Sequence, residues 1–130
     1  MTNMNDWFSG KKYVPTEADE QIVFASWLDI NQILYFHPPN GGFRNEREGA
    51  KFKRMGVKAG VPDIVIPIAR QNYHGAFIEL KRIGGKVSLH QKFWLVRLEE
   101  EGYFTAVAYG ALQAIEVARN YLQDPLRCNI

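Results

Sequence analysis

Two carboxylates and a lysine, Asp63, Glu79 and Lys81, lie in or beside segments that otherwise predict buried strands. The segments 60–66 and 75–81 are short, apolar and rich in β-branched or aromatic residues, and the loop between them is long enough for a hairpin-type return. Side chains alternate along a strand, so Glu79 and Lys81 are expected to share one face. Isolated charges in such a place are costly unless they are paired or bound to a cation. A divalent metal between the two carboxylates would therefore explain all three residues.

Such a set has a definite chemistry. Hard cations bind carboxylate and carbonyl oxygens and keep several waters, so two acids suffice when a phosphate supplies further oxygens. A metal held in this way stabilises charge on a phosphate and lowers the pKa of an attacking water. Lys81 would orient that water or neutralise charge at the pentavalent phosphorus. The residues alone also allow a plainer interpretation, in which Asp63 caps a turn and Glu79 and Lys81 form an ordinary ion pair at a sheet edge.

The composition describes one ordinary globular domain. A chain of 130 residues is long enough for a single core, and 46% hydrophobic with 23% charged residues is typical of soluble proteins. No apolar run approaches the roughly 18 residues that a membrane span needs, and the polar residues 1–12 do not resemble a secretory signal. The single cysteine, Cys128, has no partner for a disulfide or a cysteine zinc site. We therefore expect a cytoplasmic protein of a bacterial or phage-infected cell, with no membrane partner.

Positive charge is concentrated in two segments. Residues 44–58 carry six basic residues against two acids, and residues 81–92 carry four basic residues and no acid. A basic half beside a carboxylate cluster suits a phosphodiester substrate, although a solvated basic face is a common alternative. The candidate contacts to nucleic-acid phosphates are Arg44, Arg47, Lys51, Lys53, Arg54, Lys86 and Lys92.

Start and stop signals divide the chain into helices and strands. Thr16 and Ser88 are expected helix N-caps. Helices are expected at about 16–31, 44–55, 88–101 and 111–122, and strands at about 33–37, 62–68, 76–82 and 103–108. The helix between the last two strands makes a crossover, which places those strands parallel in one sheet. The expected fold is α/β, a mixed central sheet of about four strands flanked by helices, with the charged residues at one edge of the sheet.

Four short motifs resemble those of the VRR-NUC family (virus-type replication and repair nucleases) within the PD-(D/E)xK nuclease superfamily. Each motif alone is weak, whereas the four together occur in the right order over about residues 14–122. The matching segments are Glu17 with Gln21 (Glu-x-x-x-Gln), Gly60-Val61-Pro62-Asp63 (Gly-x-Pro-Asp), Glu79-Leu80-Lys81 (Glu-x-Lys) and Ser88-Leu89-His90-Gln91 (Ser-x-x-Gln).

The resemblance implies an αβββαβ restriction-endonuclease-like core. We expect the nuclease domain at 15–124, between an N-terminal arm at 1–14 and a C-terminal tail at 125–130. The small size of the chain and its single domain suggest a phage or prophage origin.

The resemblance also implies a role for each motif residue. Asp63 and Glu79 would bind Mg²⁺ or Mn²⁺, together with the backbone carbonyl of Leu80. Lys81 would position the nucleophilic water. Gln91 would reach the site from the adjoining helix and orient Lys81 or a phosphate.

Two residues are candidates for the metal-binding acid of the first helix. Glu17 would reach the metal directly or through water, and Glu20 is the alternative, because residues three apart on a helix share roughly one face. The spacing to Gln21 favours Glu17. Either acid also suits the first turn of a helix, where it stabilises the helix dipole.

The implied function is a metal-dependent endodeoxyribonuclease that hydrolyses phosphodiester bonds. The resemblance extends to Holliday-junction resolvases, so the expected substrate is branched DNA and the expected assembly is a homodimer. One alternative is a non-catalytic nucleic-acid-binding module with the same fold. Another is a nuclease without structure preference that acts on single-stranded DNA or RNA.

Overall fold

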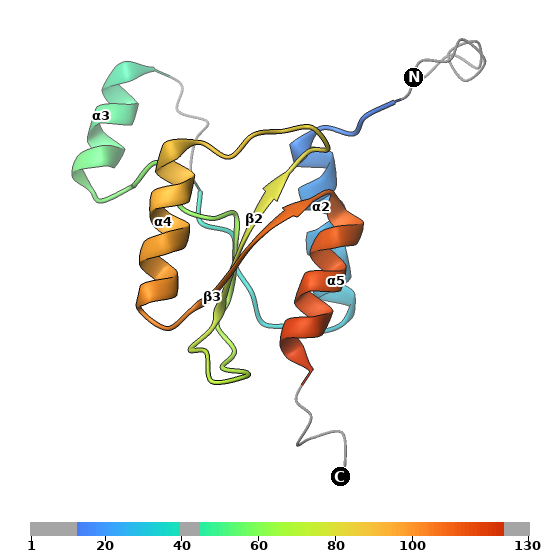
Figure 1. Cartoon of the computed structure of the whole chain (residues 1–130). Helices are drawn as coiled ribbons and strands as arrows, with labels where there is room; N and C mark the ends of the chain where they lie inside the picture. Colours follow the sequence, from blue (N-terminus) through green and yellow to red (C-terminus); the bar gives the residue numbers. More distant parts are fainter. Residues whose placement is uncertain (1–12, 40–44, 124–130) are drawn as a thin grey trace, which may run out of the picture.

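A three-stranded mixed sheet lies between helices in the computed structural model of the chain (Figure 1). The structure describes residues 13–39 and 45–123. The strand order is β1–β2–β3, with β1 antiparallel and β3 parallel to β2. The strands are β1 Ile64–Ile66, β2 Ala76–Lys81 and β3 Phe104–Tyr109, and the helices are α2 Glu17–Ile30, α3 Glu46–Arg54, α4 Leu89–Glu100 and α5 Ala111–Leu122. The predicted α/β class is confirmed.

The connections between the strands are those that the sequence predicts. A hairpin-type return joins β1 to β2, whose register pairs Ile64 with Ile78. Helix α4 then makes the crossover that brings β3 parallel to β2. This arrangement puts β2 in the middle of the sheet.

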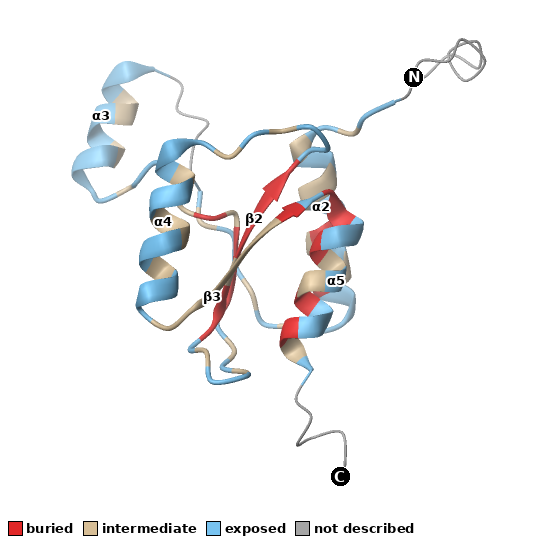
Figure 2. Cartoon of the chain, in the orientation of Figure 1, coloured by how far each residue is buried: buried red, intermediate tan, exposed pale blue. Residues whose placement is uncertain are grey.

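The two faces of the sheet are covered by different helices. Helices α2 and α5 pack on each other and on one face, and α4 packs on the opposite face (Figure 1). Phe24 and Leu28 of α2 are fully buried, as are the small residues Ala114 and Ala118 of α5. The alanines recur at i and i+4, so they let one stripe of α5 approach the core closely. Figure 2 shows the burial concentrated on β2 and on this side of α5.

The predicted strand at 33–37 is wrong. Only Phe36 pairs with Val65, through two backbone hydrogen bonds of 3.0 and 2.9 Å. In this antiparallel register the next hydrogen-bonded pairs would be Leu34 with Pro67 and Pro38 with Asp63. Each of these pairs contains a proline, which has no N–H to donate, so the ladder ends after one pair.

The sheet therefore has three described strands instead of about four, and the charged residues are not at its edge. Glu79 and Lys81 lie near the C-terminal end of β2, the central strand. A central strand is covered on both sides, which makes its charges harder to hydrate than charges on an edge strand.

Helix α3 stands apart from the rest of the fold. It begins at Asn45, whose side-chain oxygen accepts a 2.8 Å hydrogen bond from the N–H of Glu48. It has no buried residue and packs on none of the other described helices or strands (Figures 1 and 2). The prediction that the basic segment forms a short helix is confirmed.

Some predictions fall on residues outside the described ranges. These are Arg44, Cys128, the tail at 125–130 and all of the arm except residues 13 and 14. Within the described part of the chain, no helix is long and apolar enough to cross a membrane.

Candidate active site

The charged face of β2 carries Glu79 and Lys81, as the alternation of side chains predicts. Glu79 is 1% exposed and Lys81 is 8% exposed. The Lys81 Nζ atom lies 4.0 Å from Oε1 of Glu79. Ile78 and Leu80, which alternate with them, are fully buried in the apolar core. The strand thus buries two opposite charges side by side.

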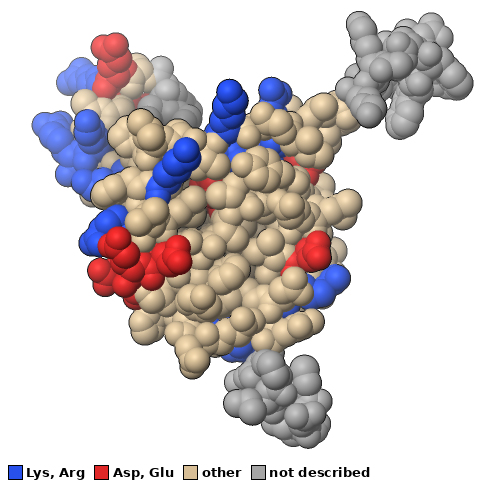
Figure 3. All heavy atoms as spheres, in the orientation of Figure 1, with Lys and Arg blue, Asp and Glu red and all other residues tan. Residues whose placement is uncertain are grey.

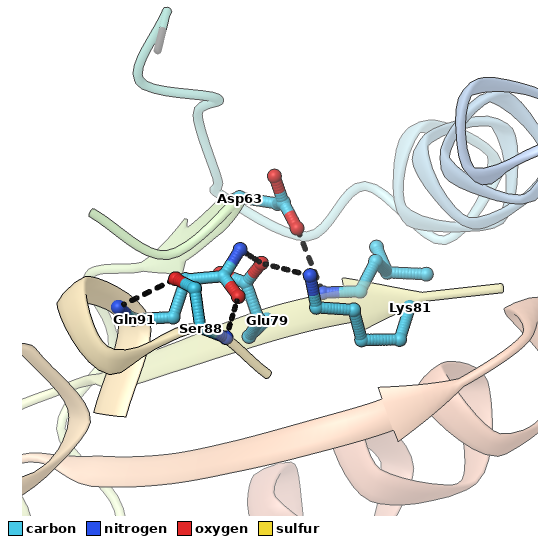
Figure 4. A network of polar contacts seen from close by, with 6 residues as sticks. Asp63, Glu79, Lys81, Ser88 and Gln91 are labelled. Atoms are coloured by element: carbon cyan, nitrogen blue, oxygen red, sulfur yellow. Dashed lines mark hydrogen bonds and ion pairs between the residues drawn. The ribbon is translucent and has the colours of Figure 1, made fainter. Parts of the chain in front are cut away.

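Asp63 joins this pair from the start of β1. Its Oδ2 atom accepts a 2.8 Å hydrogen bond from the backbone N–H of Leu80, and Figure 4 shows it facing Glu79 and Lys81. The β1–β2 register places Pro62 across from Leu80. Pro62 has no N–H, so the ladder cannot use the Leu80 carbonyl, which points to the same side of the strand as the Leu80 N–H.

Glu17 completes a group of three carboxylates, which come from α2, from the residue just before β1 and from β2. One oxygen from each of Glu17, Asp63 and Glu79 lies within 4.8 Å of the other two. Glu20 lies elsewhere, because its Oε2 atom accepts a hydrogen bond from the N–H of Ala111 at the start of α5. Glu20 thereby caps α5, whose N-cap residue Gly110 has no side chain to do so. Of the two candidate acids, the structure groups Glu17 with the others.

Gln91 reaches the cluster from the first turn of α4. Its side-chain nitrogen donates a 2.7 Å hydrogen bond to Oε1 of Glu79. Its side-chain oxygen accepts a 2.8 Å bond from the Ser88 N–H, and the Ser88 hydroxyl oxygen accepts a 3.2 Å bond from the Gln91 N–H. The Ser-x-x-Gln motif is therefore a capping box that fixes the glutamine on Glu79. Gln91 thus contacts Glu79, and its predicted role of orienting Lys81 or a phosphate stays a prediction.

Burial controls the ionisation of all three carboxylates. It raises the pKa of Glu79 to about 8, with a further contribution from the Asp63 charge and an opposing one from Lys81. Burial also raises the pKa of Asp63, against the hydrogen bond from the Leu80 N–H, and that of Glu17, against the charge of Lys81. Ionising all three groups together is thus unfavourable unless a cation compensates them.

The donor set fits a hard cation. It consists of three carboxylates, which are ligands that Mg²⁺ and Mn²⁺ prefer. The Leu80 carbonyl stays a predicted fourth ligand. Within the described chain, the buried Oε2 atom of Glu79 has no hydrogen-bond partner. A buried unpaired carboxylate oxygen is costly, and a cation would satisfy it.

His37 is a neighbour of the site that the sequence does not single out. Its ring Nδ1 lies 2.5 Å from the backbone oxygen of Asp63. The pairing of Phe36 with Val65 brings it there. The sequence does not show that the segment before Pro38 pairs with β1. No sequence signal therefore identifies His37 as a neighbour of the site.

The basic candidates within the described residues are exposed. They lie on α3, on α4 and in the connection between β2 and α4. Arg47, Lys51, Lys53 and Arg54 belong to α3, Lys92 to α4 and Lys86 to this connection. Figure 3 shows blue side chains gathered over α3 and along the same side of the molecule. None of these residues belongs to the carboxylate cluster, and their contact with phosphate stays a prediction.

Comparison with known families decides the relationship of the chain. The model of the VRR-NUC domain matches residues 16–112, which is more than half of the chain. The chain belongs to the VRR-NUC family. A solved structure of a VRR_NUC domain protein is similar to it, with a TM-score of 0.74, 36% identity and coverage of 86% of this chain and 93% of that one. The comparison with curated proteins gives no match.

Membership of this family gives the VRR-NUC chain a nuclease-type function and implies DNA as its partner. The family prediction from the four motifs is confirmed. Among the described residues, Glu17, Asp63 and Glu79 form a cluster that could bind a metal ion.

Proposed function

We propose that this chain is an endonuclease that uses Mg²⁺ or Mn²⁺ to hydrolyse phosphodiester bonds in DNA. The observation that supports it is the cluster of Glu17, Asp63 and Glu79, with carboxylate oxygens within 4.8 Å of one another. These three acids and the Leu80 carbonyl would hold the cation. The nuclease domain would span residues 15–124, with the arm and the tail outside it.

In the reaction, a water oxygen forms a bond to phosphorus, a bridging P–O bond breaks, and the departing oxygen takes up a proton. A bound cation stabilises the charge on the phosphate and lowers the pKa of water. Lys81, held by Glu79 at 4.0 Å, presents its ammonium group to the same space and positions the nucleophilic water there. Gln91 keeps Oε1 of Glu79 occupied, which leaves Oε2 to face the cation.

Contacts with the DNA backbone would come from the exposed basic residues. Each phosphate neutralised by a lysine or arginine releases counterions, so the affinity should fall steeply with salt concentration. The residues proposed for these contacts are Arg44, Arg47, Lys51, Lys53, Arg54, Lys86 and Lys92.

The proposed substrate is branched DNA, such as a four-way junction, and the proposed assembly is a homodimer. The resemblance to Holliday-junction resolvases supports both, because a two-fold dimer places two sites on two opposed strands. The exposed side chains of Leu34 and Phe36 beside β1 offer an apolar surface for a second copy. The homodimer is tested by measuring the molecular size of the wild type, of Phe36→Glu and of the control Leu112→Glu on α5. Loss of the larger species with Phe36→Glu alone is the expected result.

The deciding experiment is cleavage of labelled linear duplex, flap and four-way junction side by side. Each DNA is incubated with the wild-type protein, Lys81→Ala and the exposed neighbour Arg82→Ala, with and without Mg²⁺ or Mn²⁺. Cutting that needs the cation and is lost only in Lys81→Ala is expected. Paired cuts confined to the junction would establish the resolvase, whereas equal cutting of all DNAs would indicate a nuclease without structure preference. Junction binding with no cutting under either metal would favour the non-catalytic binding module.

A further inference from the structure

A pocket of about 570 Å³ lies between α3, the segment 57–59 and α4. Its lining includes Lys53, Val57, Lys58, His90, Phe93 and Trp94. Volumes of this size accommodate small organic groups. The carboxylate cluster does not use this pocket.

One wall of the pocket is aromatic. Phe93 is 58% exposed, although it is a large apolar side chain. Trp94 lies edge-on to it, with ring centroids 6.1 Å apart. The indole nitrogen of Trp94 donates a 3.0 Å hydrogen bond to the Ala59 carbonyl, which fixes this ring against the segment 57–59. Phe93 thus presents a free ring surface beside an anchored one.

The pocket and the carboxylate cluster share two chain segments, the one that leads into β1 and the start of α4. Gly60 has φ +85°, and a Cβ atom there would lie 2.6 Å from the backbone carbonyl carbon of His90. Only glycine lets the chain approach the start of α4 so closely. Gly60 comes three residues before Asp63, and His90 directly precedes Gln91. The pocket and the cluster are thus built on neighbouring residues of the same two segments.

The lining of the pocket also carries positive charge. Lys53 and Lys58 belong to it, and both are exposed. Lys53 belongs to α3, whose last turn is basic. Exposed aromatic rings next to cations are the chemistry with which proteins bind single-stranded nucleic acid, because bases stack on the rings while phosphates contact the cations. A second copy of this chain is a poor occupant, since the basic α3 of each copy would repel the other.

We infer that this pocket takes an unpaired nucleotide of the DNA, with its base on Phe93 and its phosphates on Lys53 and Lys58. The inference rests on the proposed function and, within branched DNA, favours substrates that carry unpaired nucleotides over the fully paired four-way junction. Flaps and splayed arms meet this condition, whereas fully paired linear duplex does not.

The test compares Phe93→Ala with Val96→Ala. Val96 is a matched control, because it is 55% exposed on the same helix and does not line the pocket. Binding is measured with EDTA present, to a blunt duplex and to the same duplex with a single-stranded extension that carries 2-aminopurine next to the branch. Stacking on the ring should quench the 2-aminopurine fluorescence in the wild-type complex.

We expect Phe93→Ala to lose about tenfold in affinity for the extended DNA, about 1.4 kcal/mol, and the quenching with it. Binding of the blunt duplex should not change, Val96→Ala should behave as the wild type, and Phe93→Tyr should restore both signals. Equal losses on the two DNAs, no loss at all, the same loss with Val96→Ala, or a changed oligomeric state of Phe93→Ala would each overturn the inference.

Failure of the pocket and failure of the proposed function are distinguishable. The binding measurement needs no cation and no cutting. A protein without nuclease activity can therefore still show binding of an unpaired nucleotide in the pocket. Conversely, a protein that cuts DNA in the presence of a metal but binds both DNAs equally well keeps the proposed function and loses the inference.

Discussion

The side-chain nitrogen of Gln91 donates a 2.7 Å hydrogen bond to Oε1 of Glu79. The same glutamine forms a capping box with Ser88, so one side chain both starts α4 and holds a carboxylate on β2. The other oxygen of Glu79 is left buried without a hydrogen-bond partner among the described residues. Helix capping and the orientation of a proposed metal ligand are therefore coupled in this fold.

Loss of this contact should weaken the site without removing a ligand. With Gln91→Ala we expect a loss of about 10–100-fold in metal affinity or activity, which is the usual effect of removing a partner of a metal ligand. The metal concentration that gives half-maximal cutting should rise, and excess metal should restore much of the rate. An unchanged metal dependence would contradict the positioning role.

A substitution of Ser88 distinguishes the effect of the capping box on helix stability from its effect on the orientation of Glu79. Ser88→Ala removes the oxygen that accepts from the Gln91 N–H, and we expect it to lower the free energy of unfolding by about 1 kcal/mol. Its effect on the metal dependence should be smaller than that of Gln91→Ala, because the glutamine amide remains. Ser26→Ala, on the exposed side of α2, is the control for a serine outside a helix cap. Thermal unfolding and metal titration of the same samples check both expectations.

The raised pKa of Glu79 predicts how the stability of the metal-free protein depends on pH. Glu79 has a pKa of about 8 in the folded state, against 4.5 as the ordinary value. Between these values the folded chain binds a proton that the unfolded chain has lost, so stability should fall as pH rises from about 4.5 to about 8. Glu79→Gln should reduce this slope and, at pH 8, raise the free energy of unfolding by roughly 1–3 kcal/mol.

Denaturant unfolding in EDTA at several pH values measures this slope. Glu116→Gln on the exposed side of α5 serves as the control and should keep the wild-type slope. If the stability of Glu79→Gln depended on pH as steeply as that of the wild type, groups other than Glu79 would dominate the pH dependence of stability. Added Mg²⁺ or Mn²⁺ should stabilise the wild type more at pH 8 than at pH 6, because the cation competes with the proton on Glu79.

Glu17 and Glu20 lie one turn apart and should have separate effects. Glu17→Gln should lower metal affinity by about tenfold or more, because it removes one of the proposed ligands. Glu20→Gln should leave metal affinity near the wild-type value and lower the free energy of unfolding by about 0.5–2 kcal/mol, since it weakens the cap on the Ala111 N–H. Calorimetric titration of both variants measures the metal affinity, and thermal unfolding measures the stability. The reverse pattern would identify Glu20 as the ligand.

This pair also shows what the sequence can predict. The period of two along residues 76–81 is enough to place Glu79 and Lys81 on one face, and the apolar runs around them give the hairpin and the crossover. The spacing to Gln21 favours Glu17, but the contact that directs Glu20 away from the cluster depends on where α5 begins, some 90 residues later in the chain. Such a contact has no local pattern.

The predicted strand at 33–37 failed for a similar reason. Its apolar residues suit a strand, but its pairing depends on the residues across from it. Prolines occur at the two places where the ladder would continue, and they lie in different parts of the sequence. The position of His37 beside Asp63 follows from the same pairing. The sequence therefore could not predict this position either.

Pro62 offers a test of the site that leaves every proposed ligand side chain in place. Pro62→Ala supplies an N–H across from Leu80, which would extend the β1–β2 ladder and engage the Leu80 carbonyl. We expect metal affinity to fall by about tenfold. The free energy of unfolding should fall by about 1–3 kcal/mol, because Pro62 is fully buried and one added hydrogen bond only partly offsets the gap that alanine leaves. Pro67→Ala, at an exposed position just after β1, is the control for loss of a proline ring and should bind metal as the wild type does. Equal affinities for all three proteins would show that the Leu80 carbonyl does not contribute to the site.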